Sequence, residues 1–310
     1  MPYFLGIDGG GSKSTAAVSD GTSVIATHSA GGCNLHSASR EDARVALHEA
    51  IRGALATAGI TAADLSSVCA GVAGAGSPAN AAKIAEILDE IIPHTSTQVV
   101  GDTVIALESY FPGAAGMVCI AGTGSVAFGR NERGEIARAG GWGRLVSDEG
   151  SGNWIGHRAI SQCIRALDMG RSSGLITSIM EGWGIVTREQ LVQRCNLDQV
   201  PNFAELFPMV LSAAESGDAI ASEILTAAGI ELARIAQIVL RRLWLGRASL
   251  EIAITGGVFD NSARIRQVFS NIIRTDRPEV HVRISERQPF EGALYLAQRV
   301  ASSSEPRQVG

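Results

Sequence analysis

The sequence predicts an α/β fold in which one structural unit occurs twice. A strand, a glycine-rich turn, a second strand, a hairpin turn and a third strand follow one another near residue 3 and again near residue 117. Such an internal repeat indicates a duplicated unit, with its seam near residues 111–116. The length of 310 residues suits two domains of about 150 residues each. With 45% apolar residues the chain can bury a core in each domain.

Local patterns place the elements of the first copy. The dipeptide Asp20-Gly21 is a typical hairpin turn between two alternating segments. A helix from about Glu41 to Ala58 is predicted because apolar residues recur there at i, i+4 and i+8. The other elements are strands at 3–8, 14–19, 23–28, 68–73 and 98–101, and helices at 80–92 and 103–110.

The second copy begins with the same strands and then becomes more helical. Long apolar stripes with helical spacing predict two long helices before the last strands. In chain order we expect strands at 117–121, 125–129 and 135–138, helices at 148–167 and 218–245, a strand at 250–255, a helix from about 261, a strand at 280–284 and a final helix at 290–300.

The segment from Ile7 to Ser14 is the strongest functional motif. Three consecutive glycines let the backbone turn close to a phosphate, and their N–H groups with a serine hydroxyl can form an anion-binding nest. The motif is not a P-loop, because its lysine stands one position too late and a strand follows it. A dinucleotide fingerprint fails because the third glycine is absent. The residues assigned to nucleotide phosphates are Gly9, Gly10, Gly11, Ser12 and Lys13.

Asp8 ends the strand that leads into this loop and is a candidate ligand of Mg²⁺. Binding through water is expected, because Mg²⁺ usually keeps part of its hydration shell. The alternative is an ordinary glycine-rich hairpin capped by Asp8. Phosphate and metal binding is favoured, because an aspartate on a buried strand before three glycines is costly unless it coordinates something.

Gly122-Thr123-Gly124 takes the place of this loop in the second copy. A hydroxyl flanked by glycines can donate a hydrogen bond to a phosphate oxygen. Alone the motif is weak, but as the symmetric partner of the first loop it predicts a phosphate that both lobes hold.

Asp102 follows the buried strand 98–101, at the edge where active sites of open α/β sheets lie. Its carboxylate could accept the proton of an attacking hydroxyl. It could equally be the N-cap of the helix that begins near Thr103. The segment alone does not decide between these roles.

Two acids follow a glycine-rich segment in the second copy. Asp148 and Glu149 could complement the dipole of a helix that begins there, or could bind adjacent sugar hydroxyls. Gly141 and the glycines around it favour a ligand pressed against the backbone. Trp142 could offer an apolar face to a sugar ring, or could belong to the core.

Two other glycine-rich segments are candidates. Small residues at Gly256 and Gly257 would let a flat adenine lie against the chain, although a plain strand-to-helix turn explains them equally well. Asn34 ends a glycine-rich loop and could bind a sugar hydroxyl or cap the next helix.

Composition excludes several classes of protein. A net charge of −5 without a basic run argues against nucleic acid as a partner. The first residues have no basic segment of a signal peptide, and no apolar run approaches the roughly 20 residues of a membrane span. Five scattered cysteines indicate a reduced, cytoplasmic protein. The six histidines have no spacing typical of a zinc site.

Taken together, these segments resemble the N-acetylglucosamine kinase branch of the BadF/BadG/BcrA/BcrD-type ATPases, within the actin-like superfamily that includes hexokinase and Hsp70. The resemblance follows family order along nearly the whole chain. It implies an α/β fold of two duplicated actin-like (ribonuclease H-like) lobes with a central cleft for ATP and sugar. Residues 1–114 would form the N-terminal lobe, joined by the final helix 290–301, and residues 115–289 the C-terminal lobe.

The resemblance also implies roles for residues that match the family motifs. Asp102 would be the base that takes the proton from the sugar 6-hydroxyl, and Asp8 would work with Mg²⁺. ATP would be held by the two phosphate loops and by an adenosine motif at Gly256-Gly257, and the protein would be a homodimer. The residues implied in sugar binding are Asn34, Asp102, Gly141, Trp142 and Asp148.

The substrate that this resemblance implies is N-acetyl-D-glucosamine, with alternatives. After Asn34 the chain has Leu35-His36, where the animal enzymes carry a Trp that helps to frame the acetyl pocket. Glucosamine and N-acetylmuramic acid therefore stay open as substrates. An ATP-driven activator of a dehydratase with an iron–sulfur cluster is a third reading, which requires exposed cysteine thiolates. A non-catalytic sensor on the same fold is disfavoured by the presence of both Asp8 and Asp102.

Overall fold

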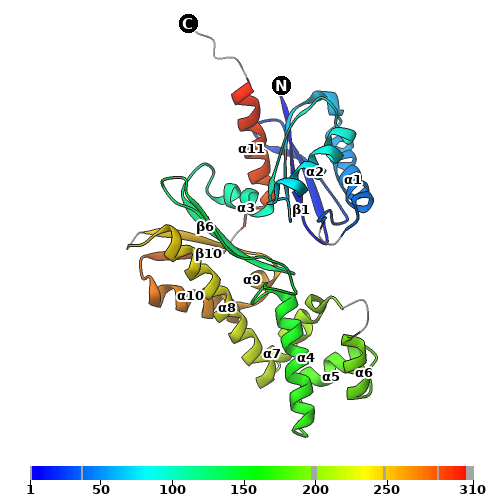
Figure 1. Cartoon of the computed structure of the whole chain (residues 1–310), viewed down its shortest axis with the longest axis vertical. Helices are drawn as coiled ribbons and strands as arrows, with labels where there is room; N and C mark the ends of the chain where they lie inside the picture. Colours follow the sequence, from blue (N-terminus) through cyan, green and yellow to red (C-terminus); the bar gives the residue numbers. More distant parts are fainter. Residues whose placement is uncertain (1, 36–37, 197–200, 247–248, 285, 305–310) are drawn as a thin grey trace. The chain divides into compact units, whose positions relative to one another are not determined.

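The computed structural model describes residues 2–35, 38–196, 201–246, 249–284 and 286–304. The chain forms two compact units, and it returns to the first unit at its end. Unit 1 comprises Met1–Ala115 and Glu286–Gly310, and unit 2 comprises Gly116–Ser285. Each unit is a sheet with helices packed on it (Figure 1).

Unit 1 is built on a mixed five-stranded sheet with the order β3-β2-β1-β4-β5. β1 pairs antiparallel with β2 and parallel with β4. The outer pairs are β2 with β3, antiparallel, and β4 with β5, parallel. The carboxyl ends of β1, β4 and β5 therefore lie at one edge. The strands are β1 (Tyr3–Gly9), β2 (Ser14–Ser19), β3 (Val24–Ala30), β4 (Leu65–Val72) and β5 (Ser96–Gly101).

Helices cover both faces of this sheet, because alternate residues of each strand point to opposite sides. Leu5 and Ile7 of β1 pack in a core with α1 and α2, whereas Phe4 packs in a second core with α3 and α11. Gly6 allows α11 to approach, since a Cβ there would lie 2.7 Å from the Phe290 carbonyl oxygen. The helices are α1 (Arg40–Ala58), α2 (Pro78–Ile91), α3 (Asp102–Tyr110) and α11 (Pro289–Ser304), with a short 3₁₀ turn, η1 (Ala62–Asp64).

Unit 2 repeats this topology. Its sheet has the order β10-β9-β6-β7-β8. β7 pairs antiparallel with β6 and with β8, whereas β9 pairs parallel with β6 and with β10. The predicted duplication within an α/β fold is confirmed strand by strand. The strands are β6 (Gly116–Ala121), β7 (Ser125–Arg130), β8 (Ile136–Gly140), β9 (Leu250–Thr255) and β10 (Val280–Ile284).

The helices of unit 2 surround one large core. The long helix α8 packs on α10 and on β7 and β8, and its apolar stripe lies in that core. Three helices between residues 168 and 218 have no counterpart among the elements predicted from sequence. Among the described helices, none combines the length and apolar character of a membrane span. The helices are α4 (Gly152–Asp168), α5 (Gly174–Gly182), α6 (Arg188–Cys195), α7 (Phe207–Glu215), α8 (Ala219–Leu243), α9 (Gly257–Asn261) and α10 (Ala263–Asp276), with a 3₁₀ turn, η2 (Phe203–Leu206).

One predicted helix start in unit 2 is wrong. The helix predicted from Asp148 begins at Gly152, because Asp148 and Gly150 have positive φ angles of 68° and 78° that no α-helix contains. The helix predicted from about residue 261 is α10, which begins at Ala263 after the N-cap Ser262, and the short helix α9 before it was not predicted.

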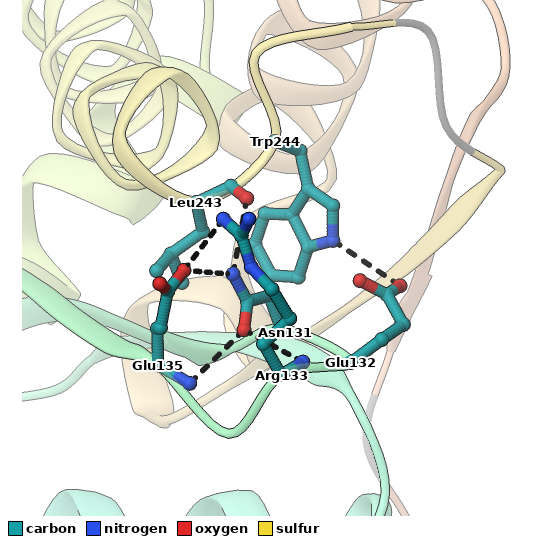
Figure 2. A network of polar contacts seen from close by, with 6 residues as sticks. All are labelled: Asn131, Glu132, Arg133, Glu135, Leu243 and Trp244. Atoms are coloured by element: carbon teal, nitrogen blue, oxygen red, sulfur yellow. Dashed lines mark hydrogen bonds and ion pairs between the residues drawn. The ribbon is translucent and has the colours of Figure 1, made fainter.

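The hairpin between β7 and β8 is tied to the end of α8 by a buried amide (Figure 2). Asn131 is 4% exposed, and its Oδ1 accepts a hydrogen bond from the Glu135 N–H at 3.0 Å. Its Nδ2 donates to the Glu135 carboxylate at 2.6 Å and to the Leu243 carbonyl at 3.4 Å. The Trp244 indole N–H donates to Glu132 at 3.4 Å. One turn thereby fixes the position of α8 against the sheet.

Candidate active site

The first glycine loop joins β1 to β2, and backbone hydrogen bonds connect it to the segments that follow β3 and β4. The loop is closed by the Gly10 N–H, which donates to the Lys13 carbonyl at 2.8 Å. The Gly9 carbonyl accepts from Ala73 at 2.8 Å, and the Gly10 carbonyl accepts from Cys33 at 3.0 Å. A Cβ on Gly9 would lie 2.5 Å from the Cys33 sulfur, so this position requires glycine. The next residues, Gly11, Ser12 and Lys13, are exposed.

Asp8 and Asp102 lie near each other at the carboxyl edge of the unit 1 sheet. Asp8 is the second-last residue of β1, and Asp102 is the residue directly after β5. Burial, followed by the nearby charge of Asp102, raises the pKa of Asp8 to about 6, and the charge of Lys13 opposes this shift. Two carboxylates that repel each other in this way attract a cation.

Asp102 is the first residue of α3, and Gly101 occupies the N-cap position. The Asp102 Oδ1 accepts the N–H of the adjacent Thr103 at 2.9 Å. Asp102 is therefore not the N-cap residue of α3 but its first helical residue, where the helix dipole favours negative charge.

Asn34 follows the buried Cys33 in the loop after β3 and is half-buried. It does not cap α1, because Ser39 takes that position and forms a capping box with Asp42. The Asn34 carbonyl accepts the Ala38 N–H at 2.9 Å. His36 lies outside the described residues.

The second glycine loop, Gly122 to Gly124, joins β6 to β7 and is attached to the first turn of α4. Its turn is closed by the Gly122 N–H, which donates to the Gly124 carbonyl at 2.9 Å. The Gly152 N–H donates to the Gly122 carbonyl at 2.8 Å, and the Asn153 N–H to the Thr123 carbonyl at 3.2 Å. Helix α4 therefore fixes this loop directly.

Asp148 lies against the second loop and does not cap α4. Ser151 is the N-cap, and its side chain accepts the Trp154 N–H. Asp148 is 7% exposed, and its Oδ1 is 3.5 Å from the Ser125 N–H nitrogen. Burial raises the pKa of Asp148, and hydrogen bonds from the Ser125 and Gly143 backbone oppose that rise. The interpretation of Asp148 as a helix cap is wrong, because its left-handed backbone turns the carboxylate toward β7.

The segment Gly140 to Gly143 is shaped by an arginine that the sequence motifs did not single out. Gly140 and Gly141 both have positive φ angles, 74° and 72°. Arg138 donates to both of their carbonyl oxygens, and its guanidinium carbon lies 4.7 Å from the centre of the Trp142 ring. Trp142 is 66% exposed and is not a core residue. The signal in the sequence is weak, since it is one arginine two residues before a glycine pair.

Gly256 and Gly257 connect β9 to α9 within unit 2. A Cβ on Gly256 would lie 2.5 Å from the Ala121 carbonyl oxygen, and its φ of 100° also requires glycine. The start of α10 and the first half of α8 line a shallow surface depression that is open to solvent. It is lined by Ser222, Glu223, Thr226, Ala227, Ile230 and Arg264.

Within the described ranges, no group of three or more His, Cys, Asp or Glu side chains could hold a metal ion. Mg²⁺ does not require such a cage, because proteins usually bind it through one or two carboxylates together with substrate phosphates. The pair Asp8 and Asp102 fits that mode, since burial and mutual repulsion already raise the pKa of Asp8.

Comparison with known proteins assigns the chain to one family. The family model described as the BadF/BadG/BcrA/BcrD ATPase family matches residues 5–297. The N-acetylmuramic acid/N-acetylglucosamine kinase of Clostridium acetobutylicum is 30% identical over 301 residues, which cover 96% of this chain and 98% of the relative. The N-acetyl-D-glucosamine kinase of Dictyostelium discoideum is 28% identical over 309 residues, which cover 95% and 97% of the two chains.

A solved structure has the same fold over nearly the whole chain. The candidate N-acetylglucosamine kinase of Chromobacterium violaceum superposes with a TM-score of 0.79 at 25% sequence identity. The superposition covers 96% of this chain and 99% of that chain. Similarity in sequence and in structure therefore spans both units.

Proposed function

This chain belongs to the BadF/BadG/BcrA/BcrD ATPase family, and we propose that it is a kinase that transfers the γ-phosphoryl group of ATP to the 6-hydroxyl of an amino sugar. The observation that carries the proposal is the pair of acids, Asp8 and Asp102, at the sheet edge beside an exposed glycine loop. N-acetyl-D-glucosamine is the proposed substrate, because both relatives compared above are named for it.

Asp102 is the proposed general base. In the transfer, the 6-hydroxyl oxygen bonds to the γ-phosphorus, and the bond from that phosphorus to the oxygen bridging the β-phosphate breaks. The hydroxyl proton passes to a carboxylate oxygen of Asp102, whose position at the end of β5 keeps it at the sheet edge. Its hydrogen bond from Thr103 holds the carboxylate in one orientation.

Asp8 is the proposed residue for Mg²⁺, with Asp102 beside it. Mg²⁺ bridged to the phosphates neutralises the negative charge that develops during phosphoryl transfer. Lys13 already compensates part of the charge of Asp8, and it lies on the exposed part of the loop, where it can contact a phosphate oxygen.

ATP is assigned to three segments, each within one unit. Gly9 to Lys13 of unit 1 and Gly122 to Gly124 of unit 2 are the proposed phosphate-binding loops, because both are tight turns that end on a strand. Gly256-Gly257 is the proposed adenosine motif, because two small residues at this strand-to-helix turn would let a flat adenine lie against the backbone.

The amino sugar is assigned to Asn34 and Asp102 in unit 1 and to Gly141, Trp142 and Asp148 in unit 2. Trp142 supports this assignment because its ring is exposed and can pack on the C–H face of a sugar. N-acetylmuramic acid is the second candidate, since the Clostridium acetobutylicum relative is named for both sugars. A cytoplasmic homodimer is the expected state of the protein, and size-exclusion chromatography with light scattering tests the dimer.

The alternative activator of a dehydratase is not supported. Four of the five cysteines are buried, and burial raises the pKa of every one of the five thiols. Ligation of an iron–sulfur cluster needs thiolates that reach the cluster, so a protein purified without oxygen should be colourless.

The test is ADP release measured with N-acetylglucosamine, N-acetylmuramic acid, glucosamine, N-acetylmannosamine, glucose and no sugar. Asp102→Asn is expected to lower kcat about 100- to 10,000-fold, because removal of a general base has effects of that size. Asp89→Asn, at an exposed aspartate of α2, is the matched control and should leave kcat unchanged. ADP release that no sugar increases would overturn the proposal.

A further inference from the structure

Arg138 is held in place by its own strand and by a neighbouring helix. It is half-buried on β8, where its backbone pairs with Phe128 of β7. Its carbonyl oxygen accepts a hydrogen bond from the Arg242 side chain of α8 at 3.2 Å. The residue is therefore fixed before its side chain reaches the loop that follows.

The guanidinium of Arg138 contacts three consecutive residues of that loop. Its Nε donates to the Gly140 carbonyl at 3.2 Å, and its Nη2 donates to the Gly141 carbonyl. The Trp142 ring then packs over the guanidinium carbon at 4.7 Å from the ring centre. A planar group with several donors can make all of these contacts at once, and an ammonium group cannot.

The loop backbone is adapted to this side chain. Two successive residues with positive φ bring both carbonyl oxygens to the same side as the guanidinium. Gly141 has a φ of 72°, which favours glycine, and a Cβ there would lie 2.6 Å from the Arg138 Nη2 and 3.0 Å from the Val126 Cβ. The contacts of Arg138 with Gly140, Gly141 and Trp142 hold this turn in one conformation.

We propose that Arg138 is a positioning residue that holds Gly141 and Trp142 in the conformation that receives the amino sugar. The inference rests on the proposed function, because it assigns a purpose to a loop that is proposed to bind sugar. One face of the Trp142 ring lies on the guanidinium, and the ring is 66% exposed, so it can form a fixed apolar surface for the sugar ring. Burial raises the pKa of Asp148, another residue assigned to the sugar, and the charge of Arg138 opposes that rise. The described hydrogen bonds of the Arg138 side chain go to Gly140 and Gly141.

Steady-state kinetics of Arg138→Met, Arg138→Lys and Arg194→Met test the proposal. Arg138→Met should raise KM for the sugar roughly 10- to 100-fold, because misplacement of positioning groups has effects of that size, and should leave KM for ATP unchanged. Arg138→Lys should restore only part of the loss, since it keeps the charge and lacks the fork of donors. Arg194 is the matched control, because its guanidinium also lies over a tryptophan ring, 5.8 Å from the centre of Trp183.

Tryptophan fluorescence provides a readout that does not depend on activity. The signal of Trp142 is the difference between a protein and its Trp142→Phe form, and its quenching by acrylamide should increase in Arg138→Met. Urea unfolding checks that the variant is folded. A folded Arg138→Met with unchanged sugar KM and unchanged Trp142 quenching would overturn the inference, as would equal rises in KM for sugar and ATP.

The proposed function and this inference can fail separately. If the wild type shows no sugar-dependent ADP release, the proposed function and the sugar-binding purpose of Arg138 are both wrong. If the wild type phosphorylates a sugar and Arg138→Met does so with the same KM, only the inference is wrong.

Discussion

The two units have the same strand order and carry different chemistry at the same turn. In unit 1 the strand before the glycine loop ends in Asp8-Gly9, whereas in unit 2 it ends in Ile120-Ala121, without an acid. The loop of unit 1 also has one more residue between its paired strand ends, Gly9 with Ser14, than the loop of unit 2, Ala121 with Ser125. The two copies therefore share the strand order, and the acid at the end of the strand before the loop occurs in unit 1 alone.

The serine that begins the second strand of each unit shows how the copies diverged. Ser125 in unit 2 donates from its hydroxyl to the Glu149 carbonyl at 2.8 Å, and its N–H faces Asp148. Ser14 in unit 1 is also buried, and it lies beside the Cys33 thiol of the loop that follows β3. A neighbouring loop contacts each turn, since the Cys33 N–H donates to the Gly10 carbonyl in unit 1, but the unit 1 turn leaves three residues exposed to solvent.

The largest expected effect tests whether charge in unit 1 is the functional difference. Asp8→Asn should lower the Mg²⁺-dependent kcat by about 100-fold or more, because it removes a charge proposed to hold the cation at the phosphates. The measurement is sugar-dependent ADP release over a range of Mg²⁺ concentrations. A variant that recovers full kcat at any Mg²⁺ concentration would show that Asp8 contributes affinity for the cation and nothing to the transfer itself.

The pH dependence of stability distinguishes the acid of the loop from the acid of the hairpin. The folded-state pKa of Asp8 is raised from 3.8 to about 6, so its contribution to stability is complete below pH 3.8 and is lost as the pH rises through 6. Without Mg²⁺, Asp8→Asn should therefore be more stable than the wild type by about 1–3 kcal/mol at pH 7.5, and this advantage should shrink toward pH 4.

Urea unfolding between pH 4 and pH 7.5 measures this effect, and Asp20→Asn is its control. Hydrogen bonds from Ser23 and Thr22 lower the pKa of Asp20 to about 2, so its contribution is present above pH 3.8 and is lost only below that range. The difference between Asp20→Asn and the wild type should stay constant over the measured pH. An Asp8→Asn advantage that does not change with pH would contradict the assigned pKa.

The strands and the charged glycine loop of unit 1 could be predicted from the sequence, because they depend on local patterns. Glycine turns and alternating strands give β2 (Ser14–Ser19) and β9 (Leu250–Thr255) the bounds that were predicted. The order Asp8 then three glycines also identified the charged loop. Both features depend on residues adjacent in the chain.

The conformation around Asp148 could not be predicted in this way. The acids before Gly150 look like a helix start, but the left-handed backbone of Asp148 is stabilised by Ser125, which is 23 residues away. Arg138 was missed for a related reason, since its contacts with the glycine turn depend on how β8 ends. The helices α5, α6 and α7 have only eight or nine residues, too few turns for a clear apolar period.

Gly122 and Gly124 of the second loop differ in how close they lie to Asp148, and substitution of each tests the contact between this loop and Asp148. A Cβ on Gly124 would lie 2.9 Å from the Asp148 Oδ2, whereas a Cβ on Gly122 would meet no atom within 4 Å. Gly124→Ala should therefore reduce the free energy of unfolding by about 1–2 kcal/mol, and Gly122→Ala should change it much less. Urea unfolding without ligands measures both. Equal effects of the two substitutions would show that Asp148 moves away from the loop without cost.

The smallest expected effect concerns the hairpins that close the two repeats. Asn131→Ala should destabilise the protein by about 1–2 kcal/mol, because it removes the partner of the part-buried Glu135 N–H and of the buried Leu243 carbonyl. Asp20→Ala should cost less, since the turn that it closes is exposed and water can replace the hydrogen bonds to Thr22 and Ser23. The free energies of unfolding from urea titrations at pH 7.5 give the comparison. If Asp20→Ala proved the more damaging of the two, the tie between Asn131 and α8 would not be what stabilises the hairpin of unit 2, and local turn geometry would account for both.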